Sequence, residues 1–294
     1  MIKLIPFQKI EKSQWDHCVI NSPQKSIFGL YDSICAACED WLGIVSNDYE
    51  AVLALPMKKK LGLSYSWHPQ FMGPLGVYSN QFNESMMLEM LNALSSKTWW
   101  MKMHYWQKCE HKDFHMTEMN FQELSLNSKT MEEIRSGYNE NTRRNLKKAA
   151  KQQLTIKQTN DINLLLTTFQ QEKGNQIDNI NHQSYILLRK LMEHWISLGF
   201  GTISEVYHGD NLAAIGYFIH WNGINIYYKG AATEDGKSCG AMHLLIDHEI
   251  EMNLENFQKF DFGGSNIESV ARFYKGFGGV DQSYYLYEYK KFKI

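Results

Sequence analysis

The chain has 294 residues, of which 44% are hydrophobic, 13% are aromatic and only 5 are prolines. This composition excludes extensive disorder, and the length predicts two domains, since single domains span about 100–200 residues. A formal net charge of −2 argues against non-specific electrostatic binding of nucleic acid, because such binding needs a basic surface. All the arginines lie at or beyond Arg135, which places recognition of phosphates or carboxylates in the second half.

The apolar segments of the sequence are too short to cross a membrane. The longest nearly uninterrupted one, residues 212–221, is about half as long as a membrane helix needs. Residues 1–6 show neither the long apolar region nor the small-residue cleavage site of a signal peptide. We therefore expect a cytoplasmic protein with no integral membrane association.

Helix and strand patterns alternate along the first half. In chain order, the predicted elements are a strand at 3–6, helices at 13–19 and 31–40, strands at 41–46 and 51–57, a loop at 68–76, a helix at 83–94, and strands at 99–106 and 123–126. The chain then turns polar at 127–130. We therefore expect an N-terminal domain at 1–126 and a C-terminal domain at 127–294.

The second half contains a β-meander between helices. Its predicted elements are a helix at 131–153, a strand at 154–158, helices at 163–173 and 182–198, strands at 201–207, 212–221 and 224–232, a loop at 233–240, a helix at 241–254, a strand at 259–262, a helix at 266–275 and a strand at 283–289. Asn222-Gly223 is a strong hairpin signal. Strands interspersed with helices predict an α/β fold with mixed central sheets flanked by helices.

The cysteines do not suggest disulfides or a metal. There are five, an odd number, and only Cys35 and Cys38 have the CxxC spacing of redox and zinc sites. No second cysteine pair accompanies them, so we expect free cysteines on an amphipathic helix and no metal ligands. The signatures of α/β-hydrolases, P-loop NTPases, zincins and dinucleotide-binding folds are also absent from the sequence.

A motif near the C-terminus resembles a known family. Asn266, Ala271 and the run Phe273-Tyr274-Lys275-Gly276-Phe277 resemble the late helix of the GNAT acyltransferases, which carries an Asn, an Ala and a Tyr before a Gly-Phe pair. The preceding Asp-Phe-Gly-Gly at 261–264 and the Phe-x-Lys-x-Phe-Gly-Gly arrangement at 273–279 more closely resemble the FemAB-like branch. That branch is built from two tandem GNAT-like domains.

Shorter motifs extend the resemblance over most of the chain. They are Trp15, Ala54-Leu55-Pro56, Gly73-Pro74-Leu75 and Arg143-Arg144-x-x-Lys147-Lys148-Ala149. The resemblance implies two tandem GNAT-like domains, with the active site in the second. It also implies roles for two residues of the late helix. Tyr274 matches the proton donor to the leaving group, and Lys275 matches a lysine that lies near the transferred group.

The segment between the strand at 224–232 and the helix at 241–254 is a candidate anion site. Backbone N–H groups at a helix start can hold a pyrophosphate where glycines allow close approach. The residues of this candidate site are Gly236, Lys237, Ser238, Cys239, Gly240 and Ala241. GNAT enzymes bind coenzyme A here with Gln/Arg-x-x-Gly-x-Gly/Ala, and this sequence departs from that pattern at Lys237 and Met242. An ordinary turn into a helix is the other interpretation.

A basic run near the start of the second half is a candidate substrate-binding segment. Arg143, Arg144 and Lys147, together with Lys148 and Lys151, fall mostly on one helical face without an intervening acid. They can meet a phosphate-bearing substrate such as a nucleotide or tRNA, or form an ordinary solvated face. Asn266 of the late-helix motif is the other candidate substrate-binding residue.

The sequence therefore predicts an enzyme that moves an acyl or aminoacyl group from an activated donor to an amine on a small molecule or peptide. The resemblance implies acyl-CoA or charged tRNA as the donor and no metal. The departures from the coenzyme A pattern favour aminoacyl-tRNA, whereas the near-neutral charge argues against a large RNA footprint. The alternative is a non-catalytic GNAT-like module that binds a phosphate-bearing ligand.

Overall fold

The computed structural model describes residues 1–174, 180–264 and 267–291, which form two compact units. Unit 1 comprises Met1–Met119 with Ser283–Ile294, and unit 2 comprises Asn120–Gln282. Both unit boundaries fall within strands, β7 (Phe114–Ser125) and β13 (Val280–Lys290). The polar segment 127–130 thus lies inside unit 2 and the last strand ends in unit 1, so the two-domain division at 126/127 remains a sequence-based prediction.

Unit 1 holds two groups of strands and three α-helices. The elements are β1 (Ile2–Pro6), α1 (Lys12–Asn21), α2 (Tyr31–Ala37), β2 (Trp41–Ser46), β3 (Ala51–Pro56), β4 (Lys58–Lys60), β5 (Leu63–Trp67), α3 (Glu84–Ser95) and β6 (Trp100–Tyr105). The strands β1-β2-β3 form an antiparallel sheet. In the second group, β4 pairs antiparallel with β5, and β5 pairs parallel with β6. Strand β6 also pairs antiparallel with the end of β13.

Large aromatic side chains form the core beside the β1-β2-β3 sheet. Trp15 of α1 and Trp41 of β2 have no exposed surface, and their ring centroids lie 5.0 Å apart. The indole N–H of Trp15 donates a hydrogen bond to the carbonyl oxygen of Gly29 at 2.9 Å. Cys35 of α2 and Cys38, directly after it, are free cysteines, and both are half-buried where the sequence predicts buried ones.

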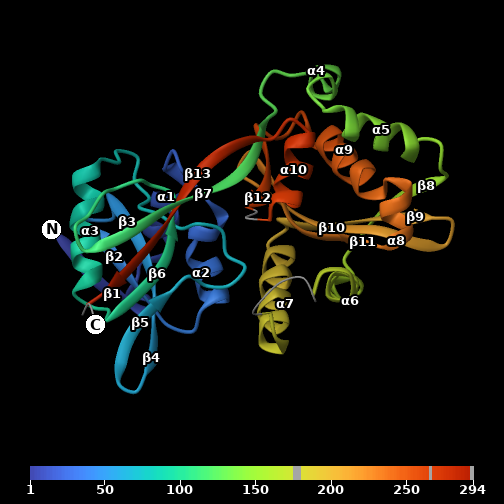
Figure 1. Cartoon of the computed structure of the whole chain (residues 1–294). Coiled ribbons are helices and arrows are strands. Elements are labelled where there is room, and N and C mark those ends of the chain that lie inside the picture. The colour runs from blue at the N-terminus through green and yellow to red at the C-terminus, as the bar shows by residue number, and fades with distance from the viewer. Residues whose placement is uncertain (175–179, 265–266, 292–294) are drawn as a thin grey trace. The chain divides into compact units, whose positions relative to one another are not determined.

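Unit 2 is a mixed sheet between two layers of helices (Figure 1). The remaining elements are α4 (Met131–Ser136), α5 (Glu140–Ala149), β8 (Leu154–Thr159), α6 (Ile162–Lys173), α7 (His182–Ser197), β9 (Gly201–His208), β10 (Asn211–Trp221), β11 (Ile224–Ala232), α8 (Glu234–Cys239), α9 (Ala241–Asn253), β12 (Lys259–Gly264) and α10 (Glu268–Gly276). The strand order is β7-β12-β11-β10-β9-β8. Among the described residues of this unit, β11 and β12 pair in parallel and the other neighbours in this order pair antiparallel.

The helices cover both faces of this sheet. In Figure 1, α6 and α7 lie on one face and α4, α5, α9 and α10 lie on the other. The core under α9 joins Leu245 and Ile246 of that helix to aromatic rings of the strands, including Phe218 and Phe260. The predicted α/β class, with mixed sheets flanked by helices, is confirmed. Among the described residues, no helix has both the length and the apolar character that crossing a membrane requires.

The region predicted as one helix at 131–153 is two helices. Thr130 and Glu133 form a capping box at the start of α4. Gly137 ends that helix, and the Asn139 side chain accepts a hydrogen bond from the Thr142 backbone N–H at 2.9 Å to start α5. A new N-cap so soon after the first helix turns the chain and lets α5 pack on α9 and α10.

Candidate functional site

The parallel strands β11 and β12 separate after a short paired stretch. Their register covers only Ile224–Lys259, Asn225–Phe260 and Ile226–Asp261, although β11 continues to Ala232 and β12 to Gly264. A register shift between β10 and β11 beside Tyr217 and Phe218 marks a bulge in the same part of the sheet. Backbone groups beyond the last pair are therefore not used in the β11–β12 ladder. A sheet opened in this way can admit the end of a substrate.

Tyr274 of α10 lies against the two residues at which the strands separate. Its ring centroid is 5.2 Å from that of Phe262 on β12 and 6.2 Å from that of Tyr227 on β11. Burial, with a further contribution from the Asp261 carboxylate, raises the pKa of the Tyr274 phenol above its ordinary value of 10. The hydroxyl is thus held protonated at neutral pH, which is the form that donates a proton.

Asp261 is a functional candidate that the sequence analysis quoted only as part of a motif. It occupies the last paired position of β12, and its Oδ1 accepts a hydrogen bond from the Gly263 N–H at 2.7 Å. Burial raises the pKa of its carboxyl group to about 6 despite that hydrogen bond. Glu123 adds to the increase, and Lys259, which forms an ion pair with Glu123 at 2.6 Å, opposes it. A carboxylate with a pKa near neutrality can accept a proton.

The alternation of β12 places Asp261 and its two neighbours on opposite faces of the sheet. Phe260 and Phe262 share the face that packs under α9, with ring centroids 4.9 Å apart. Successive side chains of a strand point to opposite faces, so Asp261 points to the face that α6 and α7 cover. Tyr274 approaches from the α10 side. The two groups therefore meet at the separation of β11 and β12 from opposite sides.

Lys229 is a further titratable group near the strand separation, in the part of β11 that does not pair with β12. Burial lowers the pKa of its ammonium group to about 8. Its Nζ donates a hydrogen bond to the Tyr228 carbonyl oxygen at 2.9 Å and lies 4.5 Å from the Tyr228 ring centroid. The sequence alone gave no signal for it, because the aromatic run around it predicts only a buried strand.

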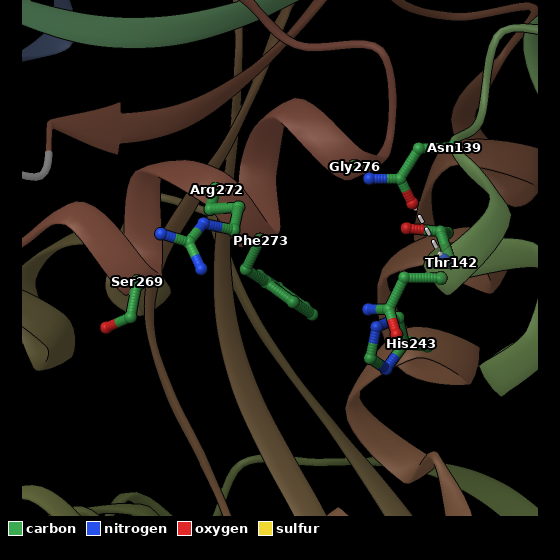
Figure 2. A pocket seen from close by; sticks show the side chains of 8 residues that line it. Asn139, Thr142, His243, Ser269, Arg272, Phe273 and Gly276 are labelled. Atoms are coloured by element: carbon green, nitrogen blue, oxygen red, sulfur yellow. Dashed lines mark hydrogen bonds between the residues drawn. The ribbon is translucent and has the colours of Figure 1, made fainter.

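A cavity of about 310 Å³ lies between α5, α9 and α10 (Figure 2). The residues that line it are Asn139, Asn141, Thr142, His243, Ser269, Arg272, Phe273 and Gly276. Burial lowers the pKa of His243 to about 4, so its imidazole is neutral, and its ring lies 4.9 Å from that of Phe273. The volume falls at the small end of the range for ligand pockets.

Helix α5 is held against two glycines of the predicted site. A Cβ on Gly240 would lie 2.7 Å from the Asn145 carbonyl oxygen, and a Cβ on Gly276 would lie 2.6 Å from Thr142 Oγ1. The Asn139 N–H also donates a hydrogen bond to the Gly276 carbonyl oxygen at 2.9 Å. Both glycines therefore permit close approach of α5.

The predicted loop at 233–240 is helix α8. Thr233 Oγ1 accepts a hydrogen bond from the Gly236 N–H at 3.1 Å, which caps the helix. Lys237 forms ion pairs with Glu172 at 3.0 Å and with Glu234 at 2.5 Å. Ser238 is exposed, whereas Cys239 and Ala241 are buried. The N–H of Gly236 and the ammonium of Lys237 thus already have protein partners.

Replacing Gly236 with alanine is expected to lower the free energy of unfolding by roughly 3 kcal/mol, because overpacking against rigid backbone is poorly relieved. The new Cβ would lie 1.8 Å from the Ala213 carbonyl oxygen. Urea denaturation of Gly236→Ala and of the exposed control Ser238→Ala measures the difference. Unchanged stability together with weaker binding of a phosphate-bearing ligand would contradict a packing role for this glycine.

The other predicted site residues lie at the surface. Arg143, Arg144 and Lys147 are exposed on α5, with Arg143 donating to the Ser136 carbonyl oxygen at 3.2 Å. Lys275 is exposed and forms an ion pair with Asp281 at 2.6 Å. Asn266 lies outside the described residues. The structure thus packs α5 against both α8 and α10. Of the predicted residues that it describes, Tyr274 is the one that lies at the strand separation.

One group of side chains in the described part of the chain has the spacing of metal ligands. His208, Asp235 and Cys239 place one ligand atom each within 4.8 Å of one another. His208 Nδ1 and Asp235 Oδ2 form an ion pair at 2.8 Å, and Cys239 Sγ lies 3.6 Å from the Gly236 carbonyl oxygen as a hydrogen-bond donor. Contacts within the protein account for these three side chains.

Comparison with known proteins identifies the family. The acetyltransferase (GNAT) domain model matches residues 136–285, just over half of the chain and most of unit 2. The chain belongs to the GNAT family. A comparison with curated proteins gives no match.

Solved structures share the fold of this GNAT protein along nearly the whole chain. FemX is similar over 97% of this chain and 96% of that chain, with a TM-score of 0.68 and 12% identity. A tandem GNAT protein from the clavulanic acid biosynthesis pathway covers 98% of each chain, with a TM-score of 0.57 and 9% identity. L-PGS from Bacillus licheniformis covers 86% of this chain and 85% of that one, with a TM-score of 0.51 and 13% identity. The predicted FemAB-like fold is confirmed.

Proposed function

We propose that unit 2 transfers an acyl or aminoacyl group from an activated donor to an amine. The observation that carries this proposal is the position of Tyr274 and Asp261 at the separation of β11 and β12. One group is a protonated phenol and the other is a carboxyl with a pKa of about 6. Pairs of groups whose pKa values are moved apart suit acid and base roles in one reaction.

In the proposed reaction, the Asp261 carboxylate accepts a proton from the acceptor ammonium group. The free amine nitrogen attacks the carbonyl carbon of the donor, so that a C–N bond forms. Collapse of the tetrahedral species breaks the C–S bond of a thioester or the C–O bond of an ester. Tyr274 donates its proton to the leaving sulfur or oxygen, and the attacking nitrogen releases its second proton to solvent as the amide forms. The proton held by Asp261 then returns to the Tyr274 oxygen through solvent, which restores both groups.

The basic face of α5 supports a donor that carries phosphates. We propose that Arg143, Arg144 and Lys147 bind these phosphates, since guanidinium groups match their geometry. Segment 236–241 contributes the N-terminal end of α9 to the same site. Lys275 remains a proposed stabiliser of charge on the transferred group, and its ion pair with Asp281 opens for that role. We keep aminoacyl-tRNA beside acyl-CoA as a proposed donor, since both carry phosphates and this sequence departs from the coenzyme A pattern at Lys237 and Met242.

Thermal unfolding with acetyl-CoA, a long-chain acyl-CoA or charged tRNA tests the proposed donor site. A ligand at a hundred times its Kd stabilises the native state by about 2.7 kcal/mol, so Tm should rise by several degrees for the true donor. The triple variant Arg143→Gln, Arg144→Gln, Lys147→Gln should lose most of this rise.

The control for that experiment removes surface lysines elsewhere in unit 2. Lys157→Gln with Lys190→Gln changes exposed charges on β8 and α7, and its Tm should still respond to the donor. An unchanged Tm of the unaltered protein with all three ligands contradicts the transferase proposal. A rise that the α5 variant keeps contradicts the assignment of the basic face. The cytoplasmic location remains a prediction.

A further inference from the structure

A hairpin at the edge of unit 1 presents leucine and lysine side chains to solvent. We call β4, the turn at Leu61-Gly62 and β5 the lysine hairpin. Its β4 is the edge strand of its sheet, and all residues of Lys58–Lys60 are exposed. Leu61 is 94% exposed at the tip and Leu63 is 46% exposed after the turn. Large aliphatic side chains this exposed at a protruding tip suggest an apolar contact outside the chain.

The backbone of the turn holds Leu61 in an unfavourable conformation. Leu61 has φ of 49° and Gly62 has φ of 78°, so both central residues of the turn are left-handed. Turns of this type normally carry Asn-Gly, because asparagine and glycine tolerate the left-handed region and leucine does not. Leucine at this position makes the turn less stable than asparagine or glycine would, and its apolar side chain is exposed. Strain of this kind at an exposed position points to a function for that side chain.

An aromatic surface continues from the hairpin along β5 and the start of β6. Trp67 and Trp99 are 42% and 40% exposed, and the Trp67 ring lies 5.0 Å from that of Trp100. Lys102 Nζ lies 5.8 Å from the Trp67 ring and Lys291 Nζ 5.1 Å from the Trp99 ring. Tryptophan flanked by lysine is typical of side chains at the boundary between lipid and water.

The charge of this surface is opposite to that of the whole chain. Segments 58–67, 97–102 and 288–291 contain seven lysines and one acidic residue, Glu288, in a chain of net charge −2. Glu288 is paired with Lys102 at 3.2 Å. Lysines on an edge strand also prevent strand pairing between molecules. That role does not account for the exposed Leu61, Trp67 and Trp99.

We propose that the lysine hairpin docks unit 1 on an anionic lipid surface. Leu61 and Leu63 enter the boundary of the acyl chains, Trp67 and Trp99 lie at the level of the headgroups, and the lysines contact anionic headgroups. An apolar tip within a basic surface is the chemistry of peripheral membrane anchors. A nucleic acid would use the lysines but would leave the leucines exposed. This proposal is independent of the donor and acceptor in unit 2.

Flotation of the whole protein with vesicles tests this proposal. We expect binding to phosphatidylcholine vesicles that contain about 30% phosphatidylglycerol, and little binding to phosphatidylcholine alone. The triple variant Lys58→Gln, Lys59→Gln, Lys60→Gln should bind roughly a hundredfold more weakly. Leu61→Asn should bind roughly fivefold more weakly while its Tm stays equal or rises, because asparagine suits the turn.

The matched control removes an equal charge from the basic face of α5. Lys147→Gln, Lys148→Gln, Lys151→Gln should keep vesicle binding, since these lysines lie in unit 2. Equal loss in this control overturns the assignment to the hairpin, as does absence of binding to the anionic vesicles. Sedimentation velocity tests the alternative that a second copy of the chain binds the lysine hairpin. A dimer that Leu61→Asn dissociates, in a protein that binds no vesicles, overturns the lipid proposal in favour of a second copy of the chain.

Discussion

Replacing Tyr274 with phenylalanine is expected to lower the rate of acyl transfer by about 10²–10³-fold, because general acid catalysis contributes about 10²–10⁴-fold. The ring would keep its contacts with Phe262 and Tyr227, so the donor should bind with nearly unchanged affinity. The measurement is release of free coenzyme A or deacylated tRNA with a panel of amines, together with the Tm rise caused by the donor. A loss confined to turnover identifies a proton donor rather than a packing residue.

The control for Tyr274 removes another buried phenol hydroxyl of unit 2. Tyr138 has 1% of its surface exposed and packs on Phe277 at a centroid distance of 5.2 Å. Tyr138→Phe should leave turnover within about threefold, since Tyr138 lies between α4 and α5 and phenylalanine keeps the ring contact with Phe277. Full turnover in Tyr274→Phe would contradict the acid role. Equal losses in both variants would show that the effect comes from packing.

Replacing Asp261 with asparagine is expected to lower turnover by about 10²–10⁴-fold and to raise stability at neutral pH. Asparagine can still accept the hydrogen bond from Gly263 but cannot accept a proton. It also removes a buried charge, since Asp261 has a pKa of about 6 in the folded protein and an ordinary value of 3.8. That difference corresponds to a stability gain on the order of 3 kcal/mol at pH 7. Activity lost together with stability gained is a signature that a purely structural residue does not give.

The pH dependence of Asp261 has a definite sign. Because its pKa is higher in the folded state, the folded state binds more protons between about pH 4 and pH 6. The contribution of this group to stability therefore falls as the pH rises through that window, and it is unfavourable above about pH 6. Asp261→Asn should flatten this part of the stability profile in urea denaturation. In the unaltered enzyme, kcat/KM should rise with pH around an apparent pKa of about 6.

Glu123→Gln gives the matched test of that pH profile. The Glu123 carboxylate raises the pKa of Asp261, so glutamine at position 123 lowers it. The substitution also removes the ion-pair partner of Lys259, and the Lys259 ammonium lowers the pKa of Asp261 further. The rise of kcat/KM with pH should therefore move to lower pH while the maximal rate changes little. A profile that stays in place would contradict the assignment of Asp261 as the titrating base.

Periodicity in the sequence predicts most helices and strands of this fold, because their apolar faces are long and regular. The meander from Gly201–His208 to Ile224–Ala232 follows the predicted order, with the turn at Asn222-Gly223. The short elements α8, β4 and β5 were not predicted. Helix α8 has a glycine near its centre, and β4 consists of three lysines without an apolar face. Each forms because tertiary contacts override weak local preference.

The centre of the proposed site depends on information that a local sequence pattern does not hold. Where β11 and β12 stop pairing is set by packing on both faces of the sheet, so the residues at that point cannot be chosen from spacing alone. The sequence shows Asp261 as a polar residue between Phe260 and Phe262. Its burial and its place at the last β11–β12 pair follow only from the fold. Gly240 belonged to the candidate anion segment, and the structure shows that helix α5 also packs closely against it.

The return of β13 to unit 1 has a consequence for the order in which the protein folds during synthesis. Strand β6 pairs with β13 from Tyr105–Tyr285 to Trp100–Lys290, so this edge of unit 1 gains its neighbour only after Val280–Lys290 has left the ribosome. Unit 2 is continuous in sequence and has all of its own strands earlier. The later part of the chain is therefore expected to complete its core first, while β6 waits for its partner.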